Sequence, residues 1–197
     1  MRVDVAAIIS PWSAVLHETE SLAVRQARTA IVSIEITLCI PRVANMRQLE
    51  ELSLWIGNAR DARDIKNVLN LGIKTIIDLA LEESPVHPTR DLVYLRFPLL
   101  DGSGNASWLM RAALTMVDLS IRSHIPTLIA CGAGMSRSPA VAAIAAAHFL
   151  GIEPSAVLVF LRTRGPIDVS PALWQDLLAT RNCALNNKSQ LTHNDEL

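Results

Sequence analysis

Short runs of apolar and β-branched residues alternate with longer segments of helical periodicity along most of this 197-residue chain. The run IKTIIDL, residues 73–79, is almost entirely apolar, as is typical of a strand in a sheet covered on both faces. The alternation predicts an α/β fold with three layers, in which helices flank a mostly parallel central sheet. Strands are predicted over residues 31–40, 52–56, 73–79, 92–97 and 127–130, and helices over residues 59–71, 108–123, 138–150, 154–163 and 171–182.

Composition supports a folded domain and excludes several kinds of protein. Half of the residues are hydrophobic and 19% are charged, which rules out wholesale disorder. The net charge of −1 argues against binding to nucleic acid or anionic membranes, because no positive field attracts their phosphates. The most apolar runs, 30–40 and 140–150, are much shorter than the ~20 residues of a membrane span. Asp4 and Pro11 interrupt the first apolar stretch, so we predict no signal peptide and expect a cytoplasmic protein.

The cysteine and histidine residues indicate neither a disulfide framework nor a metal site. The three cysteines are widely separated, so we interpret them as free thiols in a reducing compartment. The five histidines share no metal-ligand spacing with one another or with a cysteine. We therefore predict no metal and no other cofactor. The residues considered are Cys39, Cys131, Cys183, His17, His87, His124, His148 and His193.

The segment TLIACGAGMSRSPAV, residues 127–141, joins a predicted strand to a predicted helix and has the composition of a phosphate site. Its glycines allow successive backbone N–H groups to point into one concavity, and the helix N-terminus adds further N–H groups and its dipole. These partial charges favour the thiolate form of Cys131. The planar guanidinium of Arg137 can bind two phosphate oxygens. The segment therefore predicts an anion-binding loop with a nucleophilic sulfur.

Simpler interpretations of the same residues exist. A cysteine at the end of a strand is most often a small buried hydrophobe, which is our interpretation of Cys39 and Cys183. A Gly-x-Gly stretch is often only a tight turn, and a C-x5-R pattern on its own arises often by chance. Here the cysteine, two glycines, the arginine and Ser138-Pro139 all fall at one strand-to-helix junction. This coincidence favours the functional interpretation.

The segment CGAGMSRSP, residues 131–139, resembles the signature loop of the cysteine-dependent protein phosphatases, in the form typical of their dual-specificity branch. Four other segments are similar to the opening strand of that family, its next strand, the strand before its acid loop, and the segment before its last helix. They are LWIGNARDARD (54–64), LGIKTIIDLA (71–80), LVYLRFPLLD (92–101) and RGPIDVSPALWQDL (164–177).

The resemblance implies a dual-specificity-phosphatase-like catalytic domain over residues 46–185. It assigns no role to the N-terminal extension 1–45, and residues 186–197 are interpreted as a polar tail. The resemblance also implies a phosphatase-like fold and substrates that are phosphorylated proteins or small phosphomonoesters. The oligomeric state is not predicted.

The resemblance implies a role for each matching residue. Cys131 corresponds to the nucleophile that forms a phosphocysteine, and Arg137 to the residue that binds phosphate and stabilises the transition state. Ser138 corresponds to the hydroxyl that helps the thiolate leave when the intermediate is hydrolysed. Asp101, thirty residues before Cys131, corresponds to the general acid on a mobile loop. The phosphate-binding residues are Gly132, Ala133, Gly134, Met135, Ser136 and Arg137.

The general acid is also predicted from the residues themselves. Cleavage of a phosphate ester produces an alkoxide or phenolate, which needs a proton from a positioned acid. Asp101 follows a predicted strand and precedes Gly102-Ser103-Gly104, so it is expected on a flexible loop at the end of that strand. The alternative is an aspartate that only forms a turn before a glycine.

One position departs from the family pattern. The family usually has a histidine immediately before its cysteine, hydrogen-bonded into the loop, and this chain has Ala130 there. We expect a metal-independent phosphatase that acts on phosphotyrosine and, more broadly, on phosphoserine and phosphothreonine. Ala130 favours the alternative of a pseudophosphatase that binds phosphorylated partners without turnover. A rhodanese-like sulfurtransferase is a further alternative, against which Asp101 and Ser138-Pro139 argue.

Overall fold

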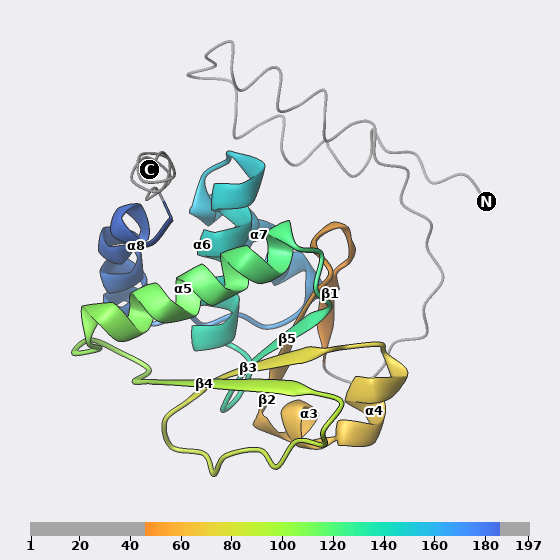
Figure 1. Cartoon of the computed structure of the whole chain (residues 1–197). Helices are drawn as coiled ribbons and strands as arrows, with labels where there is room; N and C mark the ends of the chain where they lie inside the picture. Colours follow the sequence, from red (N-terminus) through yellow and green to blue (C-terminus); the bar gives the residue numbers. More distant parts are fainter. Residues whose placement is uncertain (1–45, 186–197) are drawn as a thin grey trace, which may run out of the picture. The chain divides into compact units, whose positions relative to one another are not determined.

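The computed structural model describes residues 46–185, which form a five-stranded sheet with helices on both faces (Figure 1). The strand predicted over 31–40, Cys39 and the rest of segment 1–45 lie outside the described residues, as does the tail 186–197. The order of the strands is β1-β2-β5-β3-β4. Their bounds are Arg47–Leu49 (β1), Leu54–Asn58 (β2), Thr75–Ala80 (β3), Val93–Leu99 (β4) and Thr127–Cys131 (β5).

Four of the strands are parallel, as predicted. Strand β5 lies at the centre of the sheet between β2 and β3, and β3 also pairs with β4. Strand β1, which the sequence analysis did not predict, pairs antiparallel with β2 at the edge, with Arg47 opposite Ile56. The carboxyl ends of β5, β3 and β4 lie at one edge of the sheet, where ligands bind in open α/β folds.

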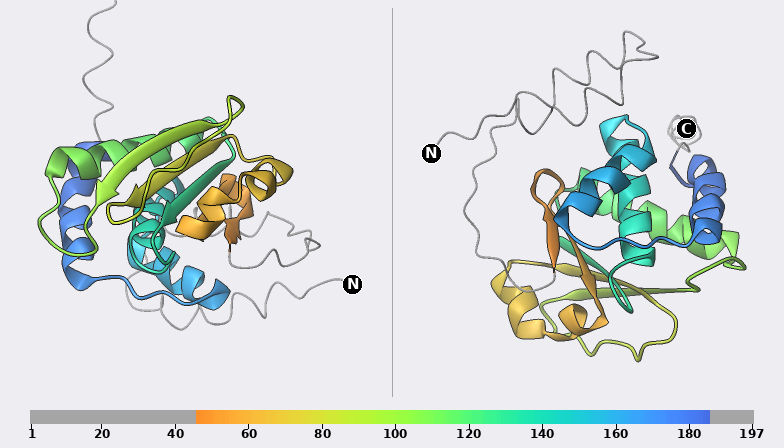
Figure 2. Two further views of the ribbon diagram at one scale, coloured as in Figure 1. Left: turned by 90° about the horizontal axis from the view of Figure 1, so that it is seen from below. Right: turned by 180° about the vertical axis from the view of Figure 1, so that it is seen from behind.

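The helices form the two outer layers (Figure 2). Helices α5, α6, α7 and α8 cover one face, and the short helices α3 and α4 cover the other. A buried hydrophobic cluster lies on each side of the sheet, which confirms the predicted three-layer architecture. The bounds are Ala59–Arg63 (α3), Ile65–Asn70 (α4), Ser107–Arg122 (α5), Arg137–Leu150 (α6), Pro154–Arg164 (α7) and Pro171–Leu185 (α8), with a 3-10 helix η1 at Glu50–Leu52.

Helix α6 is the central element of the larger helical layer. Its residues are buried from Arg137 to Ala147, and it packs against α5, α7 and α8 as well as the sheet. The alanines in this helix allow neighbouring helices to approach closely. Gly151 ends it in the left-handed conformation with a φ of 68°. The first residues of α6 are thereby held firmly at the end of β5.

The helix predicted over 59–71 is two helices, so that prediction was wrong in its extent. Asp64 leaves the helical conformation, with a φ of −79° and a ψ of 68°, and its side chain accepts a hydrogen bond from the Asn67 N–H at the start of α4. Asn58 caps α3 by accepting hydrogen bonds from two backbone N–H groups, while the Asp61 carboxylate accepts one from the Asn58 N–H.

No helix of the described part of the chain is long and apolar enough to cross a membrane.

Candidate active site

Cys131 and Ser138 lie together at the junction of β5 and α6. Cys131 is the last residue of β5 and is 1% exposed. The Ser138 hydroxyl lies 3.3 Å from Cys131 Sγ and 3.3 Å from the carbonyl oxygen of Gly57. It can donate its single hydrogen to a thiolate or to that carbonyl. This arrangement places a hydrogen-bond donor beside the sulfur.

The loop between Cys131 and Arg137 has a conformation that requires glycine at position 134. Gly134 has a φ of 74°, in the left-handed region that other residues rarely adopt. A Cβ atom there would lie 2.9 Å from the Gly57 carbonyl oxygen in β2. The glycine therefore allows the loop to pack directly against the neighbouring strand.

Arg137 is fixed by a carboxylate from another loop. The residue is 4% exposed, and one terminal nitrogen donates to Glu82 Oε2 at 2.6 Å and to the Leu99 carbonyl oxygen at 3.0 Å. Its other terminal nitrogen donates to Glu82 Oε1. Burial by itself would lower the pKa of Arg137, but the hydrogen bonds to Glu82 and the nearby charges of Cys131 and Asp101 raise it overall. The guanidinium is therefore a permanent cation in the site.

The pairing with Glu82 leaves part of the guanidinium fork unused. Of the five N–H groups of Arg137, three donate to Glu82 and Leu99. The Nε atom is buried and has no hydrogen-bond partner within residues 46–185. The Nε–H and the second hydrogen of the nitrogen beside it are parallel donors, a geometry that matches two oxygens of a phosphate.

Glu82 was not identified from the sequence as a site residue. Glu82 follows the carboxyl end of β3, and its side chain is 53% exposed on the solvent side of the ion pair. The hydrogen bond from Arg137 lowers the pKa of Glu82, so the carboxylate is charged at neutral pH. The signal in the sequence that could have identified it is an acidic residue two positions after a buried strand.

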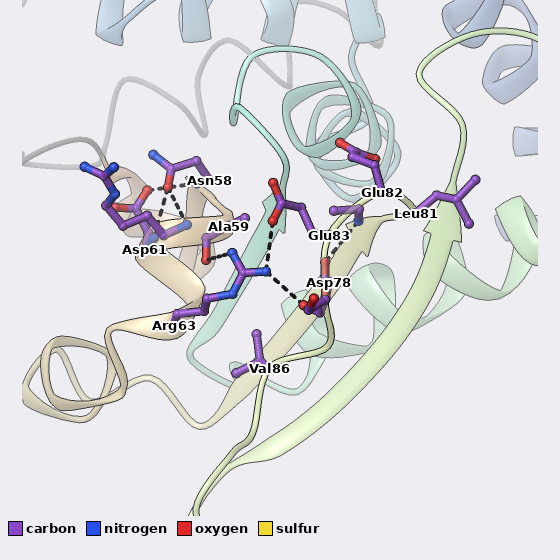
Figure 3. Close-up of polar contacts among 12 residues, drawn as sticks. Asn58, Ala59, Asp61, Arg63, Asp78, Leu81, Glu82, Glu83 and Val86 are labelled. Carbon is purple, nitrogen blue, oxygen red and sulfur yellow. Dashed lines mark hydrogen bonds and ion pairs between the residues drawn. The ribbon is translucent and has the colours of Figure 1, made fainter.

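The loop that carries Glu82 is held by arginines from two sides. Figure 3 shows Arg63 of α3 reaching this loop, where it donates to Glu83 Oε2 and to the Ser84 carbonyl oxygen, both at 2.9 Å. Arg96 of β4 donates to the carbonyl oxygens of Ala80, Leu81 and Glu83. These contacts stabilise the conformation in which Glu82 meets Arg137.

Asp101 reaches the same site from the loop after β4. Its Oδ1 accepts a hydrogen bond of 2.5 Å from the Ser136 hydroxyl, whose oxygen accepts one of 3.2 Å from the Ser170 N–H. The Asn105 side chain accepts a hydrogen bond from the Leu100 N–H at 2.7 Å and donates to the Gly102 carbonyl oxygen at 2.9 Å. The loop is therefore ordered by its own asparagine, with the carboxyl group of Asp101 held against the phosphate-binding loop.

These side chains surround one pocket of about 320 Å³. All the residues predicted for the phosphate-binding loop line it except Gly134, whose α-carbon faces β2. Ser138 does not line the pocket but contacts Cys131, which does. The residues that line the pocket are Glu82, Glu83, Asp101, Cys131, Gly132, Ala133, Met135, Ser136, Arg137 and Asp168. The fold thus brings Cys131, Arg137 and Asp101 together at one pocket.

Comparisons with known proteins find likeness in structure rather than in sequence. No model of a protein family matches the chain, and no curated protein matches it. Among solved structures it is similar to DUSP15, with 20% identity and a TM-score of 0.58 over 73% of this chain and 96% of that one. It is also similar to human DUSP28, with 18% identity and a TM-score of 0.58 over 67% of this chain and 93% of that one.

A third similar structure is the human tyrosine phosphatase-like serine/threonine/tyrosine-interacting protein. Its identity is 18% and its TM-score 0.60, over 71% of this chain and 97% of that one. The described part of the chain therefore has the fold of the dual-specificity phosphatases, which confirms the fold that the resemblance implied.

Proposed function

We propose that this chain is a phosphatase that hydrolyses phosphomonoesters through a phosphocysteine at Cys131, with residues 46–185 as its catalytic domain. One observation carries the proposal: the thiol and guanidinium of the loop 131–137 and the carboxyl group of Asp101, from the loop after β4, line a single pocket. Backbone N–H groups of the loop and the start of α6 supply the remaining donors for a phosphate.

In the first step the Cys131 thiolate attacks phosphorus. The S–P bond forms as the P–O bond to the leaving group breaks, and the carboxylic acid of Asp101 donates its proton to the departing oxygen. Arg137 binds two of the phosphoryl oxygens through its Nε–H and the adjacent N–H, and so stabilises their charge in the transition state. The products are the free alcohol or phenol and phosphocysteine.

In the second step water hydrolyses the intermediate. The Asp101 carboxylate accepts a proton from the water as its oxygen bonds to phosphorus, and the S–P bond breaks. The electron pair of that bond returns to Cys131 as a thiolate, to which the Ser138 hydroxyl donates a hydrogen bond across the present 3.3 Å separation. Inorganic phosphate leaves, and Asp101 is again protonated for the next cycle.

For the substrate we propose phosphotyrosine in proteins and, more broadly, phosphoserine and phosphothreonine. The pocket is lined by one arginine and by four acidic residues. Additional phosphate groups on a substrate would be repelled by these carboxylates, which disfavours highly phosphorylated inositol lipids. The four residues are Glu82, Glu83, Asp101 and Asp168.

A second candidate is a pseudophosphatase, and Ala130 is the observation that favours it. The side chain of Ala130 is fully buried and cannot donate a hydrogen bond to the loop. A protein of this kind would bind phosphorylated partners at the same pocket without turning them over.

Hydrolysis of an aryl phosphate in the presence of a chelator separates the two candidates. We expect turnover by the wild type, a trapped phosphocysteine after acid quenching, and no turnover by Cys131→Ser. That variant should still bind tungstate, because most of the anion donors are backbone N–H groups. Cys183→Ser is the matched control and should retain activity. Tungstate binding without any turnover by the wild type would favour the pseudophosphatase.

A further inference from the structure

We propose that Arg47 is a positioning residue for the phosphate-binding loop: its guanidinium holds the Gly134 carbonyl outward and places a positive charge behind Cys131. The inference deepens the proposed function, since the loop that it concerns is the proposed phosphate site. Arg47 lies on edge strand β1, before 54–64, the first of the segments whose sequence resembles the family. Nothing in the sequence analysis pointed to it.

The contacts of Arg47 join three segments that are far apart in the sequence. The residue is 9% exposed. One terminal nitrogen donates to the Pro166 carbonyl oxygen at 2.9 Å, and the other donates to the carbonyl oxygen of Gly134. A Cβ atom at Gly165 would lie 3.2 Å from Arg47 Cδ, so the segment before α8 packs closely on this side chain. The guanidinium therefore ties β1, the loop and that segment together.

The loop needs such a donor because of its function. An anion-binding loop turns its N–H groups inward, so its carbonyl groups point outward and, when buried, require partners elsewhere. The Gly132 carbonyl accepts from the Ala59 N–H at 3.2 Å, and the Met135 carbonyl accepts from the Asp168 N–H at 2.9 Å. The Gly134 carbonyl accepts from Arg47. Of these three partners only Arg47 acts through its side chain, so it can be tested by substitution.

The charge of Arg47 also faces the site. Among the side chains that the structure describes, it forms an ion pair with no carboxylate. Burial lowers the pKa of Arg47, whereas the nearby charges of Cys131 and Asp61 raise it. A guanidinium stays protonated at neutral pH even when buried, so its charge persists. The anionic groups that face it are the Cys131 thiolate and the Asp61 carboxylate.

Ala130 gives this arrangement its significance. A buried alanine before the nucleophile supplies neither a hydrogen bond to the loop nor a charge. Arg47 supplies both from the edge of the sheet, on the far side of β2.

The test compares Arg47→Met, Arg47→Lys and the control Arg122→Met. Arg122 is also partly buried, but it pairs with Asp118 at 2.6 Å, lies over the Phe149 ring and does not line the pocket. Two quantities are measured at neutral pH: the affinity for tungstate, and the rate at which iodoacetamide alkylates Cys131, followed by peptide mass mapping. Thermal unfolding checks that each variant is folded.

Arg47→Met should lower both the alkylation rate and the tungstate affinity by about tenfold or more, the size of effect that a nearby charge has on an ionisation equilibrium. Arg47→Lys keeps the charge and should recover most of both quantities. Equal values for Arg47→Met and Arg122→Met would overturn the proposal. If Arg47→Met does not fold, Arg47→Gln takes its place. An alkylation rate and a tungstate affinity of Arg47→Gln equal to those of Arg47→Lys would then overturn the proposal.

Neither measurement depends on turnover. A wild-type protein that fails to hydrolyse aryl phosphates contradicts the proposed function and leaves this inference standing. A folded Arg47→Met protein with unchanged alkylation and tungstate binding contradicts only the inference.

Discussion

Substituting Gly134 by alanine tests whether the loop depends on its close approach to β2. Gly134 and Gly72 have almost the same positive φ, 74° and 73°. A Cβ atom at Gly134 would lie 2.9 Å from the carbonyl oxygen of Gly57 and 3.0 Å from its carbonyl carbon, both of them backbone atoms. A Cβ atom at Gly72 would have no atom within 4 Å. Gly72→Ala is therefore a matched control that carries the conformational cost without the overlap.

The two variants should differ in stability by the cost of the overlap. An alanine in the left-handed region costs about 1–2 kcal/mol, of which about 0.4–1 kcal/mol is offset by the less flexible unfolded chain. Gly72→Ala should therefore lower the free energy of unfolding by about 1 kcal/mol. Forcing an extra carbon into a packed site adds about 1–3 kcal/mol, so Gly134→Ala should lose about 2–4 kcal/mol.

Thermal unfolding measures this difference. At roughly 2–4 °C per kcal/mol for a protein of this size, Gly72→Ala should lower the Tm by about 2–4 °C and Gly134→Ala by about 4–16 °C. Tungstate affinity should fall in Gly134→Ala alone, because the displaced loop no longer aims its N–H groups at one point. Equal losses of Tm in the two variants, with equal tungstate affinity, would refute the reasoning.

Three further predictions concern single side chains. Asp101→Asn should slow hydrolysis of esters with poor leaving groups by about 10²–10⁴-fold and should slow hydrolysis of activated aryl phosphates much less. Equal losses of rate for the two classes of ester would contradict the role of Asp101 as a general acid. The lowered pKa of Glu82 means that its pairing with Arg137 stabilises the fold fully above its ordinary pKa of 4.5 and progressively less as the pH falls through the folded value. Urea midpoints of the wild type and Glu82→Gln should therefore differ at neutral pH and converge in acid, and a difference that does not depend on pH would argue against the ion pair. Ala130→His should lower the Tm, because the imidazole must enter a fully buried position at a cost of about 1–3 kcal/mol or more; an unchanged Tm would mean that the site has room for the ring.

The sequence by itself determined the parts of this protein whose signals are contiguous. The phosphate-binding loop was predicted because Cys131, its glycines, Arg137 and the helix start at Ser138-Pro139 lie within nine residues of one another. The alternation of strands and helices, and with it the three-layer fold, was predicted because hydrophobic periodicity is local. The break at Asp64 was missed because an acidic residue near the start of one long helix suits its dipole, just as it suits the cap of a second helix.

Only the tertiary structure decided which distant residues complete the site. Glu82 meets Arg137 across 55 positions of sequence because β3 and β5 are neighbours in the sheet and end at the same edge. Arg47 meets Gly134 across 87 positions because a short strand, which local periodicity did not reveal, adds to the edge beside β2. Both contacts are set by the order of the strands, a property of the assembled sheet that no single segment of the chain encodes.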